Sequence, residues 1–464
     1  MSRDLALMPA TELVANYRAR RLSPVEAVRA ALDRIAALNG RLNAFCLIDE
    51  DAALAAARES ERRWQAGAPC GLVDGVPATV KDLILTQGWP TLRGSKTISP
   101  DQKWDEDAPA VARLKEHGAV LLGKTTTPEF GWKGVTDSPL TGVTRNPWDE
   151  GRTPGGSSGG AAVAAATGMR ALHIGTDGGG SIRIPAAFTG VFGLKPSFGR
   201  VPVYPLSPFG TLAHLGPLTR TVGDAALMLT VMAEPDARDW YALPADGRDY
   251  GHGLDDGVAG LRVAFAPTLG GAPVEPEVAR LVAAAAAVFT ELGATVDEAD
   301  PGVGDCAETF ARHWFPGAAN ALRNHGPEQR RKMDPGLIAI AEQGARLALM
   351  DYLAAVRERE ALGQRMNLFH RRWDLLLTPT LPLAAFEAGR ETPLTAAGER
   401  WTDWTPFTYP FNLTRQPAAS VPCGFTAAGL PVGLQIVGPL YRDDLVLRAA
   451  RAFEAARPFR MPAV

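Results

Sequence analysis

Two glycine-rich clusters that contain serine constrain this chain more than any other feature. They read GGSSGG at 155–160 and GTDGGGSIR at 175–183, and an alanine-rich segment followed by a short apolar run joins them. Glycine is disfavoured inside helices and strands because it loses the most backbone entropy on ordering. Such dense clusters indicate a backbone that approaches a ligand or turns with positive φ. We therefore expect a site within residues 153–196.

Apolar patterns on both sides of these clusters alternate between strands and helices. Strands are predicted near 76–81, 119–123, 169–174, 261–266, 295–298 and 373–382, and helices near 23–39, 49–66, 108–117, 161–166, 274–292 and 443–456. Residues 305–372 look largely helical, and 418–424 with 429–438 read as a hairpin. Alternation of this kind is typical of an α/β fold.

Composition excludes several classes of function. The net charge of −3 comes with scattered Lys and Arg, so we expect no nucleic-acid or membrane partner. Cys46, Cys70, Cys306 and Cys423 form no C-x-x-C pair, which argues against a disulfide framework or a zinc ribbon. No apolar run approaches the roughly 20 residues of a membrane span, and the first residues lack a signal-peptide pattern. We expect a cytoplasmic protein.

Several familiar motifs fit the clusters poorly. Residues 155–159 match G-x-S-x-G, but turn formers precede them where a nucleophile elbow needs a strand. The downstream histidines that such a triad needs, His313, His325 and His370, follow no recognisable strand and loop. Neither cluster has a phosphate-loop pattern, and no H-E-x-x-H appears. We therefore expect no bound cofactor and no metal.

Two serines and a lysine remain as candidate catalytic groups. An uncharged lysine can act as the general base for a serine hydroxyl when burial or neighbouring charges lower its pKa. Lys81, at the end of a predicted strand, is the candidate lysine. His173 and His214 are expected to be structural.

The chain resembles the amidase signature hydrolases. The resemblance rests on GVPATVKD (75–82), TRNPWD (144–149), PGGSSGG (154–160), GTDGGGSIRIPAAF (175–188) and GVFGLKPSFGRV (190–201), and it extends through TPTLP and GLPVGLQIVG. It implies a single large α/β domain over 1–464, with a central twisted mixed β-sheet covered by helices on both faces. Within it we expect a helical scaffold (1–66), a catalytic core (71–230), a pocket or lid region (231–372) and C-terminal strands and a helix that complete the sheet (373–464).

The resemblance also implies roles for individual residues. The triad would be Lys81, Ser157 in a cis peptide linkage, and the nucleophile Ser181, 24 residues further on. The oxyanion hole would come from the backbone N–H groups of Gly178, Gly179, Gly180 and Ser181. Ser158 and Thr176 would support the site. Asp177 and Arg183 flank the nucleophile, and we expect them to pair and fix its loop.

The substrate is the least constrained part of the prediction. Many family members read EFAMG where this chain has Glu129-Phe130-Gly131-Trp132, so we expect Gly131 and Trp132 in the pocket wall, with aromatics of 314–315 and 401–411. This favours aryl or apolar amides, and carbamates, hydrazides and esters stay open. The alternatives are an amidotransferase subunit that supplies ammonia for tRNA-dependent amidation and a non-catalytic binding protein. The expected partners are a small amide and water, and the expected state is a monomer or homodimer.

Overall fold

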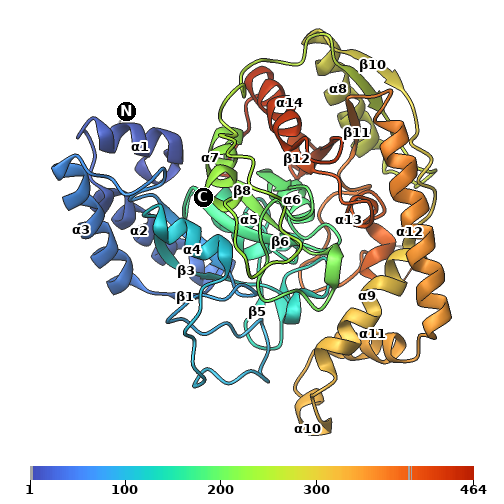
Figure 1. The fold of residues 1–464 in the computed structure, drawn as a ribbon, viewed down its shortest axis with the longest axis horizontal. Coiled ribbons are helices and arrows are strands. Elements are labelled where there is room, and N and C mark those ends of the chain that lie inside the picture. Colours follow the sequence, from blue (N-terminus) through green and yellow to red (C-terminus); the bar gives the residue numbers. More distant parts are fainter. Residues whose placement is uncertain (1–3, 395–397, 399, 464) are drawn as a thin grey trace.

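The computed structural model describes residues 4–463 except 395–397 and 399, and one large mixed sheet organises them (Figure 1). Eleven strands form it in the order β1-β3-β2-β6-β8-β7-β12-β13-β11-β9-β10. They are β1 Phe45–Ile48, β2 Pro77–Lys81, β3 Val120–Thr125, β6 Leu172–Asp177, β7 Phe192–Lys195, β8 His214–Thr219, β9 Arg262–Phe265, β10 Thr295–Glu298, β11 Leu375–Pro379, β12 Ala418–Phe425 and β13 Pro431–Val437. β4 Asp137–Ser138 and β5 Gly142–Val143 pair separately.

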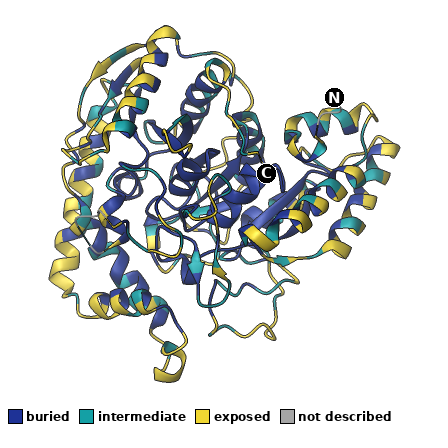
Figure 2. Ribbon diagram, turned by 180° about the vertical axis from the view of Figure 1, so that it is seen from behind, coloured by how far each residue is buried: buried dark blue, intermediate teal, exposed yellow. Residues whose placement is uncertain are grey.

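Helices cover both faces of the sheet, which confirms the predicted fold class. They are α1 Ala10–Arg18, α2 Pro24–Leu42, α3 Glu50–Ala66, α4 Pro109–Glu116, α5 Gly159–Ala166, α6 Arg183–Thr189, α7 Val222–Met232, α8 Pro276–Glu291, α9 Ala307–Leu322, α10 Pro327–Arg330, α11 Pro335–Ala345, α12 Leu349–Phe369, α13 Pro410–Leu413 and α14 Asp443–Ala456. Both α5 and α7 pack on β6 and β8. Figure 2 shows buried residues at the centre and exposed ones on the outer helices.

Three neighbouring strands of the sheet, β3, β2 and β6, are parallel, and this places the functional segments. β2 pairs in parallel with β3 and with β6, and its Val80 lies opposite Ile174 of β6. Every residue of β2 is buried, as expected for a parallel strand covered on both faces. The carboxyl ends of β2 and β6 therefore meet at the same edge of the sheet, where each strand leads into residues singled out by the sequence.

Local signals predict most element starts but not all of their ends. Ser23 caps the start of α2: its hydroxyl accepts the N–H of Val25 and its own N–H donates to Glu26, as the capping box predicts. The predicted end near residue 39 is too early, because the helix continues through Gly40. It extends this far because Leu42 still packs in the core, and it ends at Asn43, whose φ of 52° lies in the left-handed region.

The strand predicted at 169–174 lies three residues further along the chain. β6 spans Leu172–Asp177, and the preceding Arg170 is buried with its guanidinium donating to the carbonyl of Ala27. The shift matters because β6 then ends directly at the second glycine cluster. The hairpin β12–β13 and the helix α14 are confirmed. Across the chain outside the gaps just given, no helix is both long and apolar enough to cross a membrane.

Candidate active site

The two glycine clusters lie together at the carboxyl ends of β2 and β6. Lys81 is the last residue of β2, and Thr176 is the next-to-last residue of β6. The first cluster leads into α5, and the Thr136 hydroxyl holds it by donating to the Gly155 carbonyl and accepting the Gly159 N–H. The sheet register thus brings together a lysine and serines that are far apart in sequence.

Lys81 is the centre of this cluster. Its Nζ lies 2.7 Å from the Ser157 Oγ, 2.9 Å from the Ser158 Oγ and 2.8 Å from the Thr176 Oγ1. The side chain is completely buried. Burial lowers the pKa of Lys81 well below its usual value, and the negative charge of Asp177 only partly opposes this. The site therefore favours an uncharged amine surrounded by hydroxyl groups.

The two neighbouring serines differ in their hydrogen bonds. The Ser158 hydroxyl donates to the Thr176 carbonyl at 3.1 Å and accepts the Thr176 N–H at 3.2 Å, so its bonding capacity is used within the protein. Ser157 has only Lys81 as a partner among the described side chains, and it lines a cavity. The Gly156–Ser157 peptide bond is cis, as the resemblance implied.

A buried ion pair fixes the loop that carries Ser181. Arg183 donates through Nε and Nη2 to the two carboxylate oxygens of Asp177, both at 2.9 Å, and neither side chain is exposed. Burial alone would raise the pKa of Asp177, but the Arg183 guanidinium holds it well below its usual range. Asn412 adds a hydrogen bond of 2.9 Å to the same carboxylate. The expected pair exists, and it belongs to the interior rather than to the surface.

The expected set of oxyanion donors needs a correction at Gly180. Its N–H donates to the Asp177 carboxylate at 2.8 Å, so it points into the loop and away from the cavity. The N–H groups of Gly178, Gly179 and Ser181 donate to no group in the part of the chain that the structure describes. Of the four expected oxyanion donors, the N–H groups of Gly178, Gly179 and Ser181 therefore remain as candidates.

Aromatic packing gives the glycines of this loop a second role. A Cβ at Gly178 would lie 2.7 Å from the ring of Trp314, and one at Gly179 would lie 2.7 Å from the rings of Phe310 and Trp401. Such distances are far below van der Waals contact, so any side chain here would displace the rings or the loop. These aromatic rings pack directly against the backbone that carries the candidate oxyanion donors.

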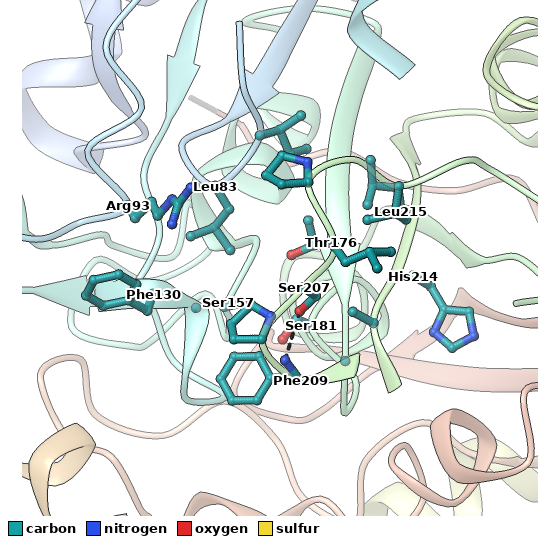
Figure 3. Close-up of a pocket in the computed structure, with 18 of the residues that line it drawn as sticks. Leu83, Arg93, Phe130, Ser157, Thr176, Ser181, Ser207, Phe209, His214 and Leu215 are labelled. Carbon is teal, nitrogen blue, oxygen red and sulfur yellow. Dashed lines mark hydrogen bonds between the residues drawn. The ribbon is translucent and has the colours of Figure 1, made fainter. Parts of the chain in front are cut away.

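A cavity of about 360 Å³ opens above these groups (Figure 3). Ser157, Thr176, Gly178 and Ser181 form its polar end. The rest of the wall is largely apolar and comes from Leu83, Ile84, Ala108, Phe130, Gly131, Val203, Pro205, Leu206, Pro208, Phe209, Ala213, Leu215 and Trp314, with Arg93, Tyr204, Ser207 and His214 as the remaining members. Apart from His214, the sequence did not single out residues 203–215, although Pro205 and Pro208 favour a loop there.

Trp132 does not line this cavity, contrary to expectation, whereas Gly131 does. Phe130 and Gly131 both have positive φ, 52° and 71°, and this turn directs the Trp132 side chain into the protein. There its ring packs against Gly336, and its carbonyl accepts the indole N–H of Trp314 at 3.2 Å. Trp132 thus supports the wall from behind. Of the other aromatic residues expected in the wall, Trp314 lines it, and Phe315 and residues 401–411 do not.

The two central histidines have different surroundings. His173 is enclosed, with one ring nitrogen 2.7 Å from the Thr79 hydroxyl and the other 2.9 Å from the Arg170 carbonyl. His214 uses Nδ1 to contact the Leu212 carbonyl at 2.8 Å, and it also lines the cavity. Burial lowers the pKa of both, so both are neutral. Within the described ranges, no group of three His, Cys, Asp or Glu side chains is placed to hold a metal.

Comparisons with known sequences and structures all match one family. A sequence model of the family described as Amidase matches residues 26–447. An acylamidase from Rhodococcus erythropolis is 41% identical over 463 residues, which covers 98% of this chain and 97% of the relative. A glutamyl-tRNA(Gln) amidotransferase subunit from Myxococcus xanthus is 37% identical over 491 residues, with 98% of each chain covered. The crystal structure of a bacterial aryl acylamidase of the amidase signature enzymes superposes with a TM-score of 0.91 at 35% identity, covering 97% of this chain and 96% of the other.

Proposed function

This chain belongs to the amidase signature family and hydrolyses amide C–N bonds, and from that premise we propose that it acts on aryl and other apolar carboxylic amides through a Ser181 acyl-enzyme. Lys81 and Ser157 would form the proton relay. The observation that carries the proposal is the buried Lys81 Nζ, which faces three hydroxyls and forms no ion pair within the described residues. Its lowered pKa supports the role of a base.

The contacts of Lys81 suit an uncharged amine, which has two hydrogens and one lone pair. The Ser158 hydroxyl already donates to the Thr176 carbonyl, so towards Lys81 it can only accept. A second N–H can serve Thr176. The lone pair is then left for the Ser157 hydroxyl, which can in turn take a proton from Ser181. This supports Ser157, rather than Ser158, as the member that passes the proton.

The reaction would proceed in two halves. The Ser181 Oγ attacks the amide carbon as its proton passes to Ser157 and the Ser157 proton passes to Lys81. The carbonyl oxygen, now negative, accepts hydrogen bonds from the free N–H groups of the nucleophile loop. The C–N bond breaks as Ser157 gives a proton to the leaving amine and Lys81 returns one to Ser157. Water then repeats the sequence on the acyl-enzyme and releases the acid.

The apolar cavity wall supports the proposed substrate class. Phe130, Phe209 and Trp314 offer aromatic surface, and Leu83 and Leu215 add aliphatic surface. The names of the similar proteins, an acylamidase and an aryl acylamidase, point the same way. Carbamates, hydrazides and activated esters would use the same acyl chemistry, so they belong in the same assay panel. The proposed reaction needs no cofactor and no partner beyond a small amide and water.

A second candidate function is the ammonia-supplying amidotransferase subunit, and the 37% identity to such a protein favours it. That role requires partner subunits and glutamine as substrate, and the largely apolar wall offers the charged end of glutamine only Arg93 as a charged contact. Release of ammonia from free glutamine, together with copurification of partner subunits, would replace our proposal with this one.

The test compares variants of the two candidate serines. Wild-type protein should release 4-nitroaniline from 4-nitroacetanilide and react covalently with a fluorophosphonate probe. Ser181→Ala should abolish both, and Ser157→Ala should abolish turnover. Ser207→Ala is the matched control for labelling, because Ser207 lines the same cavity but its hydroxyl accepts the Phe209 N–H at 3.2 Å. Labelling that survives Ser181→Ala and disappears with Ser207→Ala would contradict the proposal, and inert wild-type protein would favour a binding function.

A further inference from the structure

One permanently charged side chain lines the otherwise uncharged cavity, and it is Arg93. Within the described residues its guanidinium forms no ion pair and no hydrogen bond, although the residue is partly buried. In Figure 3, Arg93 lies on the same side of the cavity as Leu83 and Phe130, and His214 and Leu215 lie on the opposite side. A guanidinium that is withdrawn from water without an acceptor is unfavourable, so this position favours an acceptor supplied by a ligand.

The loop around Arg93 is built to hold this residue in place. Arg93 has φ 56°, in the left-handed region that residues other than glycine rarely adopt. The Asp82 carboxylate accepts the N–H groups on either side, from Leu92 at 3.2 Å and Gly94 at 3.3 Å. The Arg93 carbonyl accepts the Phe130 N–H at 2.8 Å. The backbone is therefore fixed by neighbours while the side chain stays available to the cavity.

Asp82 does not serve as the partner of Arg93. Its Oδ1 lies 3.7 Å from the Nζ of Lys124, and its oxygens accept the backbone N–H groups of the loop. Burial lowers the pKa of Arg93, and the nearby Asp82 offsets this only in part. An arginine nevertheless keeps its charge at neutral pH. Arg93 also borders a neighbouring depression lined by Asp105 and Glu106, but within the described residues neither carboxylate pairs with it, so its guanidinium is free to bind an anion in the cavity.

The wall that contains Arg93 adjoins the side of the site where the leaving amine would lie. A Cβ at Gly131 would be 2.6 Å from Leu83 and 3.4 Å from the Ser157 Oγ, so Leu83, Gly131 and Ser157 are close together. In the proposed reaction, Ser157 gives the proton to the leaving amine. The amine half of the substrate must then extend along this wall, towards Leu83, Phe130 and Arg93.

We propose that Arg93 binds an acidic group, in the simplest case a carboxylate, on the amine half of the substrate amide. The proposal rests on the proposed function and specifies its substrate class: amides whose apolar body ends in an acid. The planar guanidinium fork matches a carboxylate with two parallel hydrogen bonds, which the neutral wall residues cannot offer. Hydrolysis would release a carboxylic acid and an amine that retains the acidic group.

The test uses two substrates of almost the same shape. 4-Acetamidobenzoate carries a carboxylate where 4-nitroacetanilide carries a planar, uncharged nitro group, and the measured quantity is the ratio of their kcat/KM values. Arg93→Met should lower the ratio of carboxylate to nitro substrate by about 10- to 100-fold, the range for a hydrogen-bonded charge pair. Arg93→Lys should restore part of it. Lys103→Met is the matched control, because Lys103 lines only the neighbouring depression beyond Arg93 and should leave the ratio unchanged.

Two further measurements make each outcome decisive. In a Ser181→Ala background, calorimetry should show that Arg93→Met weakens binding of 4-acetamidobenzoate by a similar factor, and circular dichroism checks that the variant is folded. An unchanged ratio with Ser181-dependent nitroanilide cleavage would overturn the role of Arg93 alone. Selective loss of activity on the monoanilide of butanedioic acid, whose carboxylate is on the acyl half, would also overturn it. Failure of wild-type protein to cleave any anilide would overturn the proposed function as well.

Discussion

Replacing Lys81 by methionine tests the central chemical claim while preserving the packing. Methionine has about the length of lysine, is apolar and fills the same fully buried space. The substitution removes the amine from three hydroxyls, of which Ser158 keeps its bonds to Thr176. Ser157 loses its only partner among the described side chains. The hydrogen bonds that are lost therefore lie along the path that the proton would take.

The expected effects on activity and on stability have opposite signs. Removal of a general base costs about 10²- to 10⁴-fold in rate, or about 3–5 kcal/mol in the activation free energy. Stability should rise, because the pKa of Lys81 in the folded protein lies below its unfolded value. Between those two pKa values the unfolded chain binds more protons, so folding with Lys81 becomes more favourable as the pH rises. The gain in stability from Lys81→Met should thus be largest at low pH and should disappear as the pH approaches 10.5, the pKa of lysine in the unfolded chain.

The assay measures kcat/KM for 4-nitroacetanilide and the melting temperature from pH 5 to pH 10. For the wild-type enzyme, kcat/KM should rise with pH as Lys81 loses its proton and then level off. Lys81→Met should be nearly inactive at every pH and melt at a higher temperature than wild type at pH 6. Turnover of the variant within tenfold of wild type would refute the reasoning. So would a difference in melting temperature between variant and wild type that is smaller at pH 6 than at pH 10.

Three further predictions concern packing and charge. Gly179→Ala places a Cβ 2.7 Å from the rings of Phe310 and Trp401, and it should lower kcat by about 100-fold while the protein stays folded. Gly363→Ala, in α12 with open space around the new Cβ, should leave kcat unchanged and stabilise by about 0.5–1 kcal/mol. Burial raises the pKa of Glu391 to about 7, so the stability it lends at low pH is lost as the pH rises through 7. Glu391→Gln should therefore stabilise the protein at pH 8 by about 1–2 kcal/mol, seen as a higher melting temperature, but hardly at pH 5. An equal gain in melting temperature at both pH values would show that ionisation is not the cause.

The sequence predicted those parts of the site that depend on short segments. Lys81 could be placed at the end of a strand because the alternation before it is a local signal, and the serines because the glycine clusters are continuous motifs. The contact between Lys81 and Ser157 at 2.7 Å, in contrast, depends on which strands are neighbours in the sheet. Spacing along the chain carries no such information, so there only the family resemblance brought these residues together.

The errors at Trp132 and Gly180 have local causes of different kinds. The side chain of Trp132 turns inward because two successive residues before it have positive φ, and Phe130 is not a residue whose type announces such a turn. Gly180 could have been interpreted correctly. An aspartate that accepts the N–H three residues later is a common motif at loop and helix starts, and Asp177 stands three residues before Gly180. A run of glycines gives freedom of direction, and it is the neighbouring carboxylate that selects the direction.

The aromatic wall links the width of the cavity to the loop that carries Ser181. Trp314 lines the cavity, and its ring also limits the space at Gly178, far away in sequence. A smaller side chain at 314 would widen the cavity and remove the contact that confines the nucleophile loop. Larger substrates would then gain room while the N–H group of Gly178, a candidate oxyanion donor, loses its fixed direction. Because preorganised donors contribute to rate only when they are held in place, a wider pocket obtained at this position should come with a lower kcat.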